Sequence, residues 1–303
     1  MDDDRRTFYP ELWNEKGIRA TQVDQVWFAG VHSNVGGGYV KHGMSLVALD
    51  WMMAEAERCG LRFIQADRDY VRTHQDVHDE LYNARAGLGV YYRWEPRDLV
   101  TLCREHHITY PKIHVSVLER IANGTGCYAP ITLPHQCLVV RTNDERSWPS
   151  DETLWAIEKQ VAHVEKGGIG QEKNGSLLDE MDRDIASGKW SYRIFLAASI
   201  PAIAWWYNLP PFPQAVETIA QWCPYPNLVI GGIYACVGLL VWGCPSESYN
   251  RMEFVAQNHW QRHRQALRSI LSSSRKEQPS PSTDDVQLGG AITQQVASDF
   301  VLK

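Results

Sequence analysis

A short strand–loop–helix unit constrains the fold of this chain more than any other feature of its sequence. The run 25–31 is almost continuously apolar, which is typical of a strand buried on both faces. Three consecutive glycines lie within 32–39 and predict a sharp loop, because glycine adopts backbone conformations that other residues avoid. Ser45 predicts the N-cap of a helix that runs to Cys59, and Gly60 predicts its left-handed end. The N-terminal part is therefore predicted to have an α/β fold.

Composition limits the class of protein to which the chain can belong. Its 303 residues, 44% of them hydrophobic, suffice for about two domains with a buried core. A net charge of -6 argues against nucleic acid as a partner. Seven cysteines without a CxxC pair favour reduced thiols over a zinc ribbon or a disulfide framework. His74 and His78 would share one face of a polar predicted helix but lack a third ligand, so we expect neither a metal site nor a cofactor.

His32 is the side chain of the loop that is best placed for chemistry. It follows the predicted strand directly, and reactive groups collect at the carboxyl ends of strands in open α/β sheets. Imidazole titrates near neutral pH, so His32 is a candidate general base. A histidine in a tight turn is also a common structural residue, and the local residues alone favour this structural interpretation, because a lone histidine is a weak signal. The loop lacks the GxGxxG spacing and the P-loop lysine, so nucleotide binding is not expected.

The string QVWFAGVHSNVGGGY at 25–39, followed by MSLVALDWMMAEAERCGL, closely resembles the phospholipase effectors of type VI secretion, an α/β-hydrolase family. Weaker similarity extends this resemblance over about residues 4–134. The resemblance implies that His32 is the triad histidine that activates a serine for phospholipid ester hydrolysis through an acyl-enzyme. It places the loop glycines at the binding site, and it implies a membrane-anchoring region and a secretion-system or immunity partner. These loop glycines are Gly36, Gly37 and Gly38.

The nucleophile of such a hydrolase is missing from this sequence. The chain contains no GxSxG elbow, and serine and acid normally precede the histidine in this family, whereas only 31 residues precede His32. We assign neither Asp24 nor the aspartates at 2–4 as the triad acid. Residues 1–145 are therefore expected to form only the last strand, histidine loop and helix of a truncated hydrolase, with the missing N-terminal half as a possible partner. The alternative is a non-enzymatic, membrane-anchored remnant that binds lipid or a partner.

Two uncharged segments, 194–210 and 226–242, distinguish a predicted helical region at 150–271. The first spans ~26 Å as a helix, slightly less than a ~30 Å hydrocarbon core. Trp and Tyr residues bracket both segments, and basic residues flank the pair, which places both ends on the cytoplasmic side of a membrane. A buried hairpin of a soluble domain is the alternative. Residues 272–303 are predicted to be disordered, and the absence of a signal peptide at Met1 would fit an effector exported by another route.

Overall fold

The computed structural model describes residues 1–19, 22–143, 148–163, 181–207 and 212–276. Its sheet is small, with the strands β1 (Val26–Trp27), β2 (Lys112–His114) and β3 (Leu138–Val140) in the order β1-β2-β3. Both strand pairs are parallel, and Ile113 of β2 lies opposite Trp27 on one side and Val139 on the other. The strands therefore join three segments that are far apart in the sequence.

The expected α/β-hydrolase fold is wrong for the described part of the chain, which is mostly helical around this short sheet. The apolar run 25–31 forms ladder bonds only at Val26–Trp27, because Gly30, with a φ of +113°, turns the backbone away. The segment 112–122, expected to be one helix, instead divides into β2 and the helix α5 (Val115–Asn123). The side chain of His114 accepts a hydrogen bond from the backbone N–H of Ser116 and so begins α5 where β2 ends.

Three helices surround the glycine loop: α1 (His32–Gly36), α2 (Gly43–Arg58) and α3 (Gln65–His74). The end of α2 is as predicted, with Gly60 at a φ of +92° just beyond it. Its start is not, because α2 begins at Gly43 and the Ser45 hydroxyl donates to the carbonyl of His42. The helix α3 ends at His74, so His78 lies outside it and the two histidines do not share a helix face.

The rest of the body, as we call residues 1–163, consists of short elements around one main core. They are the 3-10 turns η1 (Arg6–Phe8), η2 (Gly87–Tyr91) and η3 (Thr125–Cys127), and the helices α4 (Leu99–Glu105), α5 and α6 (Asp151–His163). The core joins β1–β3 to α4, α5 and α6, with Ile113, Leu118 and Ile157 fully buried. Its members come from the whole length of the body, which is thus one packed unit.

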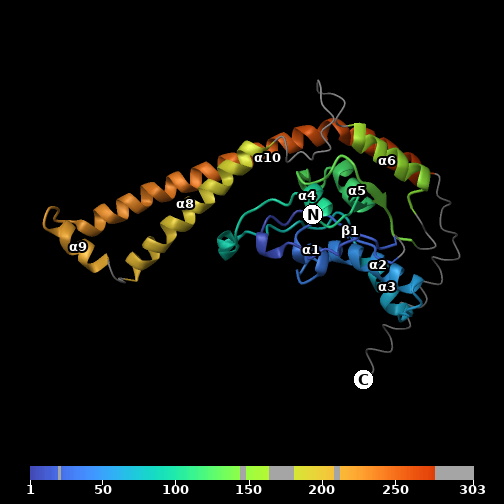
Figure 1. The fold of residues 1–303 in the computed structure, drawn as a ribbon, viewed down its shortest axis with the longest axis horizontal. Coiled ribbons are helices and arrows are strands. Elements are labelled where there is room, and N and C mark those ends of the chain that lie inside the picture. Colours follow the sequence, from blue (N-terminus) through green and yellow to red (C-terminus); the bar gives the residue numbers. More distant parts are fainter. Residues whose placement is uncertain (20–21, 144–147, 164–180, 208–211, 277–303) are drawn as a thin grey trace, which may run out of the picture.

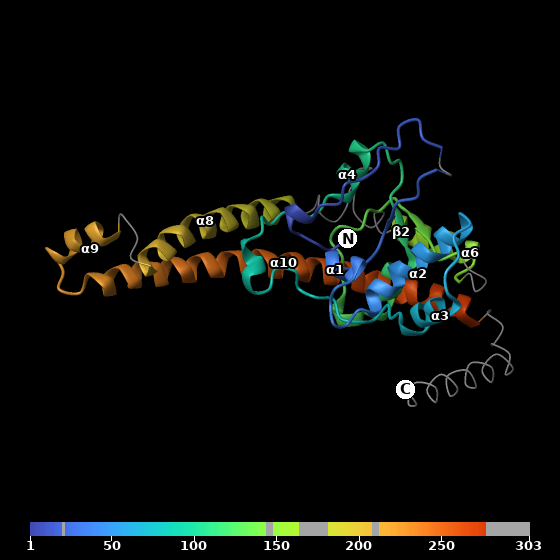
Figure 2. The same cartoon turned by 90° about the horizontal axis from the view of Figure 1, so that it is seen from below.

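A long helical arm projects from the body (Figures 1 and 2). It is formed by α8 (Asp182–Trp206), α9 (Phe212–Ala220) and the first half of α10 (Pro226–Lys276), and we call residues 182–251 the arm. The helix α8 runs outward and α10 returns along it, and the second half of α10 then packs on the body core through Trp260 and Leu267. The predicted segment 226–242 therefore lies within the longer helix α10, which continues to Lys276, into the predicted tail. The predicted segment 194–210 lies in α8 as far as Trp206, and residues 208–210 lie outside the described residues. Residues 277–303, the rest of that tail, lie outside the described residues.

The predicted membrane-spanning pair is not supported. In the portion of the chain that the structure describes, no helix combines the length and the apolar character needed to cross a bilayer.

Candidate functional site around the histidine loop

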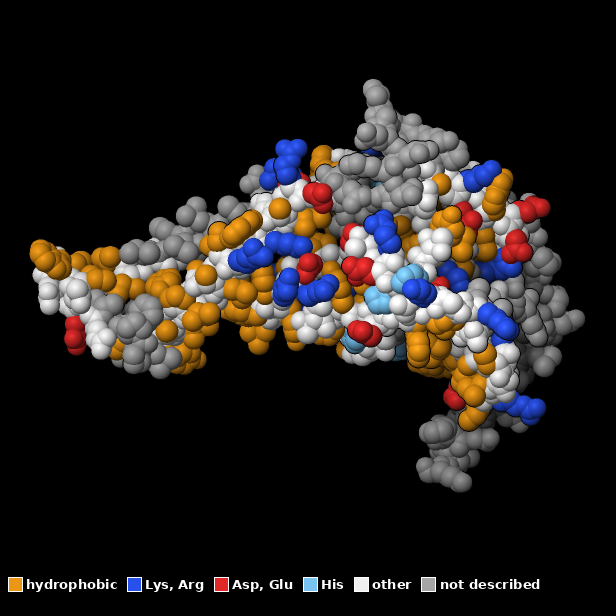
Figure 3. All heavy atoms as spheres, in the orientation of Figure 1, with side chains coloured by type: hydrophobic (Ala, Val, Ile, Leu, Met, Phe, Trp, Pro, Cys, Tyr) orange, Lys and Arg blue, Asp and Glu red, His pale blue; other side chains and the backbone are white. Residues whose placement is uncertain are grey.

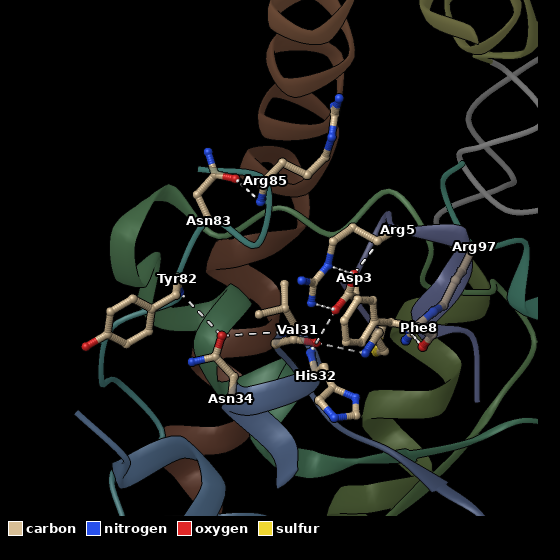
Figure 4. A network of polar contacts seen from close by, with 12 residues as sticks. Asp3, Arg5, Phe8, Val31, His32, Asn34, Tyr82, Asn83, Arg85 and Arg97 are labelled. Carbon is tan, nitrogen blue, oxygen red and sulfur yellow. Dashed lines mark hydrogen bonds and ion pairs between the residues drawn. The ribbon is translucent and has the colours of Figure 1, made fainter. Parts of the chain in front are cut away.

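The backbone of the histidine loop depends on Gly30. A Cβ atom at this position would lie 2.4 Å from the Cβ of Asn34, and the φ of +113° disfavours any L side chain. Asn34 itself is buried, its Nδ2 donates to the carbonyl of Glu80 at 2.9 Å, and its Oδ1 accepts from the backbone N–H of Tyr82 at 3.3 Å. Asn34 thus joins the loop to the segment 80–82 (Figure 4). These two hydrogen bonds are made by the Asn34 amide and not by the His32 imidazole.

His32 is the first residue of α1, and its imidazole is exposed at the carboxyl end of β1. Phe8 packs edge-on against the imidazole, with 5.1 Å between ring centroids. In Figure 4 the imidazole points away from the Asp3 carboxylate and toward open space. An exposed imidazole held by an aromatic neighbour can accept a proton from a hydroxyl group that is brought to it.

The three loop glycines follow His32 at the end of α1 and just beyond it. Gly37 and Gly38 have φ values of +87° and +115°, which explains why glycine occupies both positions. Gly36 ends α1, and no atom lies within 4 Å of the point where its Cβ would be. The structure therefore places all four sequence-predicted site residues together on one short turn.

Asp3 is a site residue that the sequence interpretation missed. Its carboxylate is fully buried and accepts two hydrogen bonds from the guanidinium of Arg5, at 2.9 and 2.7 Å. The same carboxylate accepts the backbone N–H of His32 at 3.0 Å (Figure 4). Burial alone would raise the pKa of Asp3, but the hydrogen bonds from Arg5 and from the His32 backbone outweigh it and lower this pKa below its ordinary value. Asp3 is thus a carboxylate held in its charged form against the backbone of His32.

Asp2 is bound to the backbone just after β1, at Gly30. Its backbone N–H donates to the carbonyl of Gly30 at 3.1 Å, and its carboxylate accepts the N–H of Gly30 at 2.6 Å. The hydroxyl of Tyr128 donates to the same carboxylate oxygen at 2.9 Å. Burial and the charge of Asp2 raise the pKa of Tyr128 well above its ordinary value, so this hydroxyl stays a donor. Two carboxylates therefore adjoin the histidine loop, where the sequence interpretation assigned none.

A cavity of about 280 Å³ lies next to these carboxylates. Its wall includes Asp2, Asp3, Val31, Tyr82 and Arg97 from the surroundings of the loop, together with part of the segment 126–132 and the start of the packed half of α10. Arg97 is buried, and its guanidinium donates to the carbonyl of Phe8 at 2.6 Å. Burial lowers the pKa of Arg97, although Asp3 partly compensates, which indicates a weakly solvated cation at this wall.

A second histidine–serine pair lies in the body but is closed to solvent. The Oγ of Ser116 is 2.9 Å from Nδ1 of His114, and both side chains are buried. Phe28 stacks on the His114 ring with 4.7 Å between centroids, and burial lowers the pKa of His114 to about 3. A histidine that stays neutral and inaccessible cannot serve an external substrate, so this pair has a structural role.

Comparison with known proteins gives one match, and it falls on this site. Residues 1–55 match the family described as T6SS, phospholipase effector Tle1-like, catalytic domain. No curated protein and no solved structure matches the chain. The matched stretch contains Asp2, Asp3, His32 and the glycines 36–38, so the region that the structure assembles around His32 is the region that is similar to a type VI phospholipase effector.

Proposed function

We propose that this chain carries the histidine and carboxylate part of a site that hydrolyses phospholipid esters in the manner of a serine hydrolase. The observation that supports this most strongly is the hydrogen bond from the His32 backbone to the buried carboxylate of Asp3, within the stretch that matches a phospholipase catalytic domain. In serine hydrolases a buried carboxylate positions the histidine and stabilises its protonated form. Asp3 differs from that arrangement in one respect, because it accepts the backbone N–H of His32 and not an imidazole N–H. In this proposal it positions the His32 backbone, and Arg5 keeps it charged.

The proposed reaction assigns two proton transfers to His32. His32 first takes the proton of a serine hydroxyl while the serine oxygen attacks the ester carbonyl, and it then gives that proton to the departing alcohol oxygen. Water hydrolyses the acyl-enzyme with His32 again as base, which releases a fatty acid and regenerates the serine. Because these 303 residues contain no GxSxG, the serine in this proposal comes from a segment outside them.

Two results test the catalytic proposal. The chain alone is expected to hydrolyse a fluorogenic phospholipid no faster than its His32→Asn variant, because a histidine without its nucleophile supplies little catalysis. The DNA upstream of Met1 is then searched, in the same reading frame, for a stretch that encodes GxSxG. The adjacent gene is searched for the same stretch. Joined to that product, the chain is expected to gain activity that His32→Asn abolishes and that His74→Asn, on the exposed face of α3, leaves intact. Absence of any such stretch, or equal activity of the joined protein and its His32→Asn variant, would contradict the proposal.

A second candidate function is binding to a phospholipid surface without catalysis, and the arm favours it. Residues 194–216 and 218–246 contain no charged residue, and large apolar side chains of the arm face solvent. Trp222 is 88% exposed and Leu228 is 73% exposed. Basic side chains gather instead where the arm meets the body, as Figure 3 shows; they include Lys189, Arg193 and Arg251. An apolar end followed by a basic boundary suits a partner with an apolar interior and anionic headgroups.

The lipid-binding function is tested by flotation with vesicles of phosphatidylcholine and phosphatidylglycerol. Leu228→Glu is expected to reduce co-flotation at least tenfold, because a charge on the apolar end would have to enter the lipid interface. The matched control is Ile64→Glu, since Ile64 is 71% exposed but lies on the body between α2 and α3. Equal loss in both variants, or no flotation of the parent chain, would rule out the arm as the lipid-binding element.

A further inference from the structure

Three histidines meet at the junction where the second half of α10 lies on the body. His259 and His263 are one turn apart on α10, with 5.4 Å between their ring centroids. His135 belongs to the segment that leads into β3, and its ring centroid is 6.2 Å from that of His259. His135 is buried, and the Nε2 of His259 is buried without a hydrogen-bond partner among the described residues.

Trp260 fixes α10 to the body at the same junction. Its indole is 2% exposed, and its N–H donates to the carbonyl of Pro130 at 2.9 Å. The ring of His259 meets the Trp260 ring edge-on, at 5.2 Å between centroids, and the ring of His263 lies 6.5 Å from it. The two histidines of α10 therefore adjoin the residue that anchors this helix.

Among the described residues, the charged neighbour that acts on His259 and His263 is a cation. On α10 the charged neighbour is Arg262, which acts on both His259 and His263. From α6, the neutral amide of Gln160 lies 3.5 Å from Nδ1 of His263. The charged residues next to it are engaged elsewhere, since Glu158 accepts the backbone N–H of Val139 and Lys159 lies over the Trp155 ring.

We propose that His259 and His263, packed beside His135, form a pH-sensitive joint, in which their protonation under mildly acidic conditions loosens α10 from the segment 130–137 and releases the base of the arm. A proton on either residue places a positive charge beside the other one, His135 and Arg262, in a partly buried contact. This inference is independent of the proposed hydrolase function, because it rests on the packing of α10 alone.

The direction of the pH effect follows from burial. Burial lowers the pKa of His259 to about 4, and the charges of His263, His135 and Arg262 act in the same direction. Burial, Arg262 and His135 also lower the pKa of His263. A histidine in an opened joint has an ordinary pKa of about 6.5, so opening is coupled to proton uptake and the joint weakens as the pH falls from about 6.5 toward 4. The Arg264 and Arg268 guanidinium groups donate to the Ile121 and Ala122 carbonyls and hold the following turns of α10 on α5.

Hydrogen exchange of the full chain, read by mass spectrometry at several pH values, tests the joint. After correction for intrinsic exchange, the protection factor of peptides within 256–267 is expected to fall roughly twentyfold between pH 7 and pH 5, the factor for one histidine with these two pKa values. Peptides of α5 within 115–123 are expected to change far less. His259→Gln should remove most of the fall, and His263→Gln provides an independent second variant should the first not fold at pH 7.

Three outcomes would contradict the proposed joint. The first is a wild-type protection factor at 256–267 that does not change with pH. The second is a fall that persists unchanged in His259→Gln and His263→Gln. The third is an equal fall at α5, which would indicate general unfolding instead. His74→Gln, a substitution on exposed α3, is the control and should keep the wild-type fall.

Discussion

The body buries apolar side chains in a core, whereas the outer end of the arm exposes several of them. One core buries residues from β1–β3, α4, α5 and α6 of the body together with residues from the second half of α10. In the arm, α8 and α10 pack on each other, yet Trp222, Tyr225 and Leu228 near the outer end face solvent. The body is therefore stabilised by packing with the second half of α10, whereas the outer arm exposes apolar surface of the kind that marks interaction sites.

The polar groups show the same contrast. The body buries charges and satisfies them over long sequence distances, as when Tyr128 donates to Asp2 and Arg68 pairs with Asp50 at 2.6 Å. The arm places its basic residues at its root, where Lys189 pairs with Glu95 of the body. The difference fits the proposed division of roles, in which the packed body holds the histidine loop and the arm binds a lipid surface.

The largest expected effect comes from the buried Trp260, which we compare with the exposed Trp222 of the arm. Trp260→Ala should lower the free energy of unfolding by about 3–5 kcal/mol, because it removes a fully buried ring and leaves the Pro130 carbonyl without its donor. Trp222→Ala, at the exposed end of the arm, should change it by less than about 0.5 kcal/mol. Urea denaturation measures both, and a large loss with Trp222→Ala would show that the arm end is buried in the folded chain.

Acid should weaken the body through His114, while the uncharged arm segments contain no histidine at all. Burial lowers the pKa of His114 to about 3, so the folded state keeps it neutral while the unfolded chain takes up a proton below pH 6.5. This histidine alone should cost roughly 2–3 kcal/mol of unfolding free energy between pH 6.5 and pH 4.5. His114→Asn retains a capping residue for α5 and should reduce the pH slope by that amount, whatever its absolute stability. An unchanged slope would mean that His114 is protonated in the folded protein.

The histidine loop offers a matched pair of glycine substitutions. Gly30→Ala should destabilise the body by about 2 kcal/mol or more, because the new Cβ meets Asn34 and the φ is positive. Gly36→Ala, with open space around it and a helical backbone, should stay within about 0.5 kcal/mol of the parent. Thermal unfolding compares them, and equal effects would contradict the loop geometry described above.

The smallest effect is expected for Leu228→Ser on the arm. Removal of a solvent-exposed apolar side chain should leave the unfolding free energy within about 0.5 kcal/mol and should reduce self-association of the free chain. Sedimentation velocity with and without vesicles measures this. A clear loss of stability would place Leu228 in a core and weaken the contrast between body and arm.

Local features were predictable from the sequence, and long-range ones were not. The turn at Gly60 and the position of His32 after a strand follow from neighbouring residues, and the structure has both. The division of 112–122 into β2 and α5 depends on pairing of Ile113 with Trp27 and Val139, which no local pattern specifies. The apolar run 25–31 predicts a longer strand than the two residues of β1 for the same reason. An apolar run alone does not indicate how many of its residues pair with another strand.

The candidate site shows the same limit. His32 and its glycines stand out as a string, whereas the aspartates at 2 and 3 look like a polar terminus until Gly30, Tyr128 and the His32 backbone are brought to them. The adjacent Arg5 was an available signal, because a buried carboxylate needs a partner. In the arm, the uncharged segments predicted a membrane-spanning pair, which is wrong for the described residues, because α8 and α10 are longer helices that also contain charged residues.

The most direct test of the central claim is phospholipid turnover by the chain joined to a serine-bearing segment, compared with its His32→Asn variant. The account predicts a loss of roughly 10⁴-fold or more in kcat, because a triad without its histidine loses almost all covalent catalysis. Asp3→Asn should be impaired in the same assay with its binding of lipid unchanged. Equal turnover by His32→Asn and the parent would contradict the account.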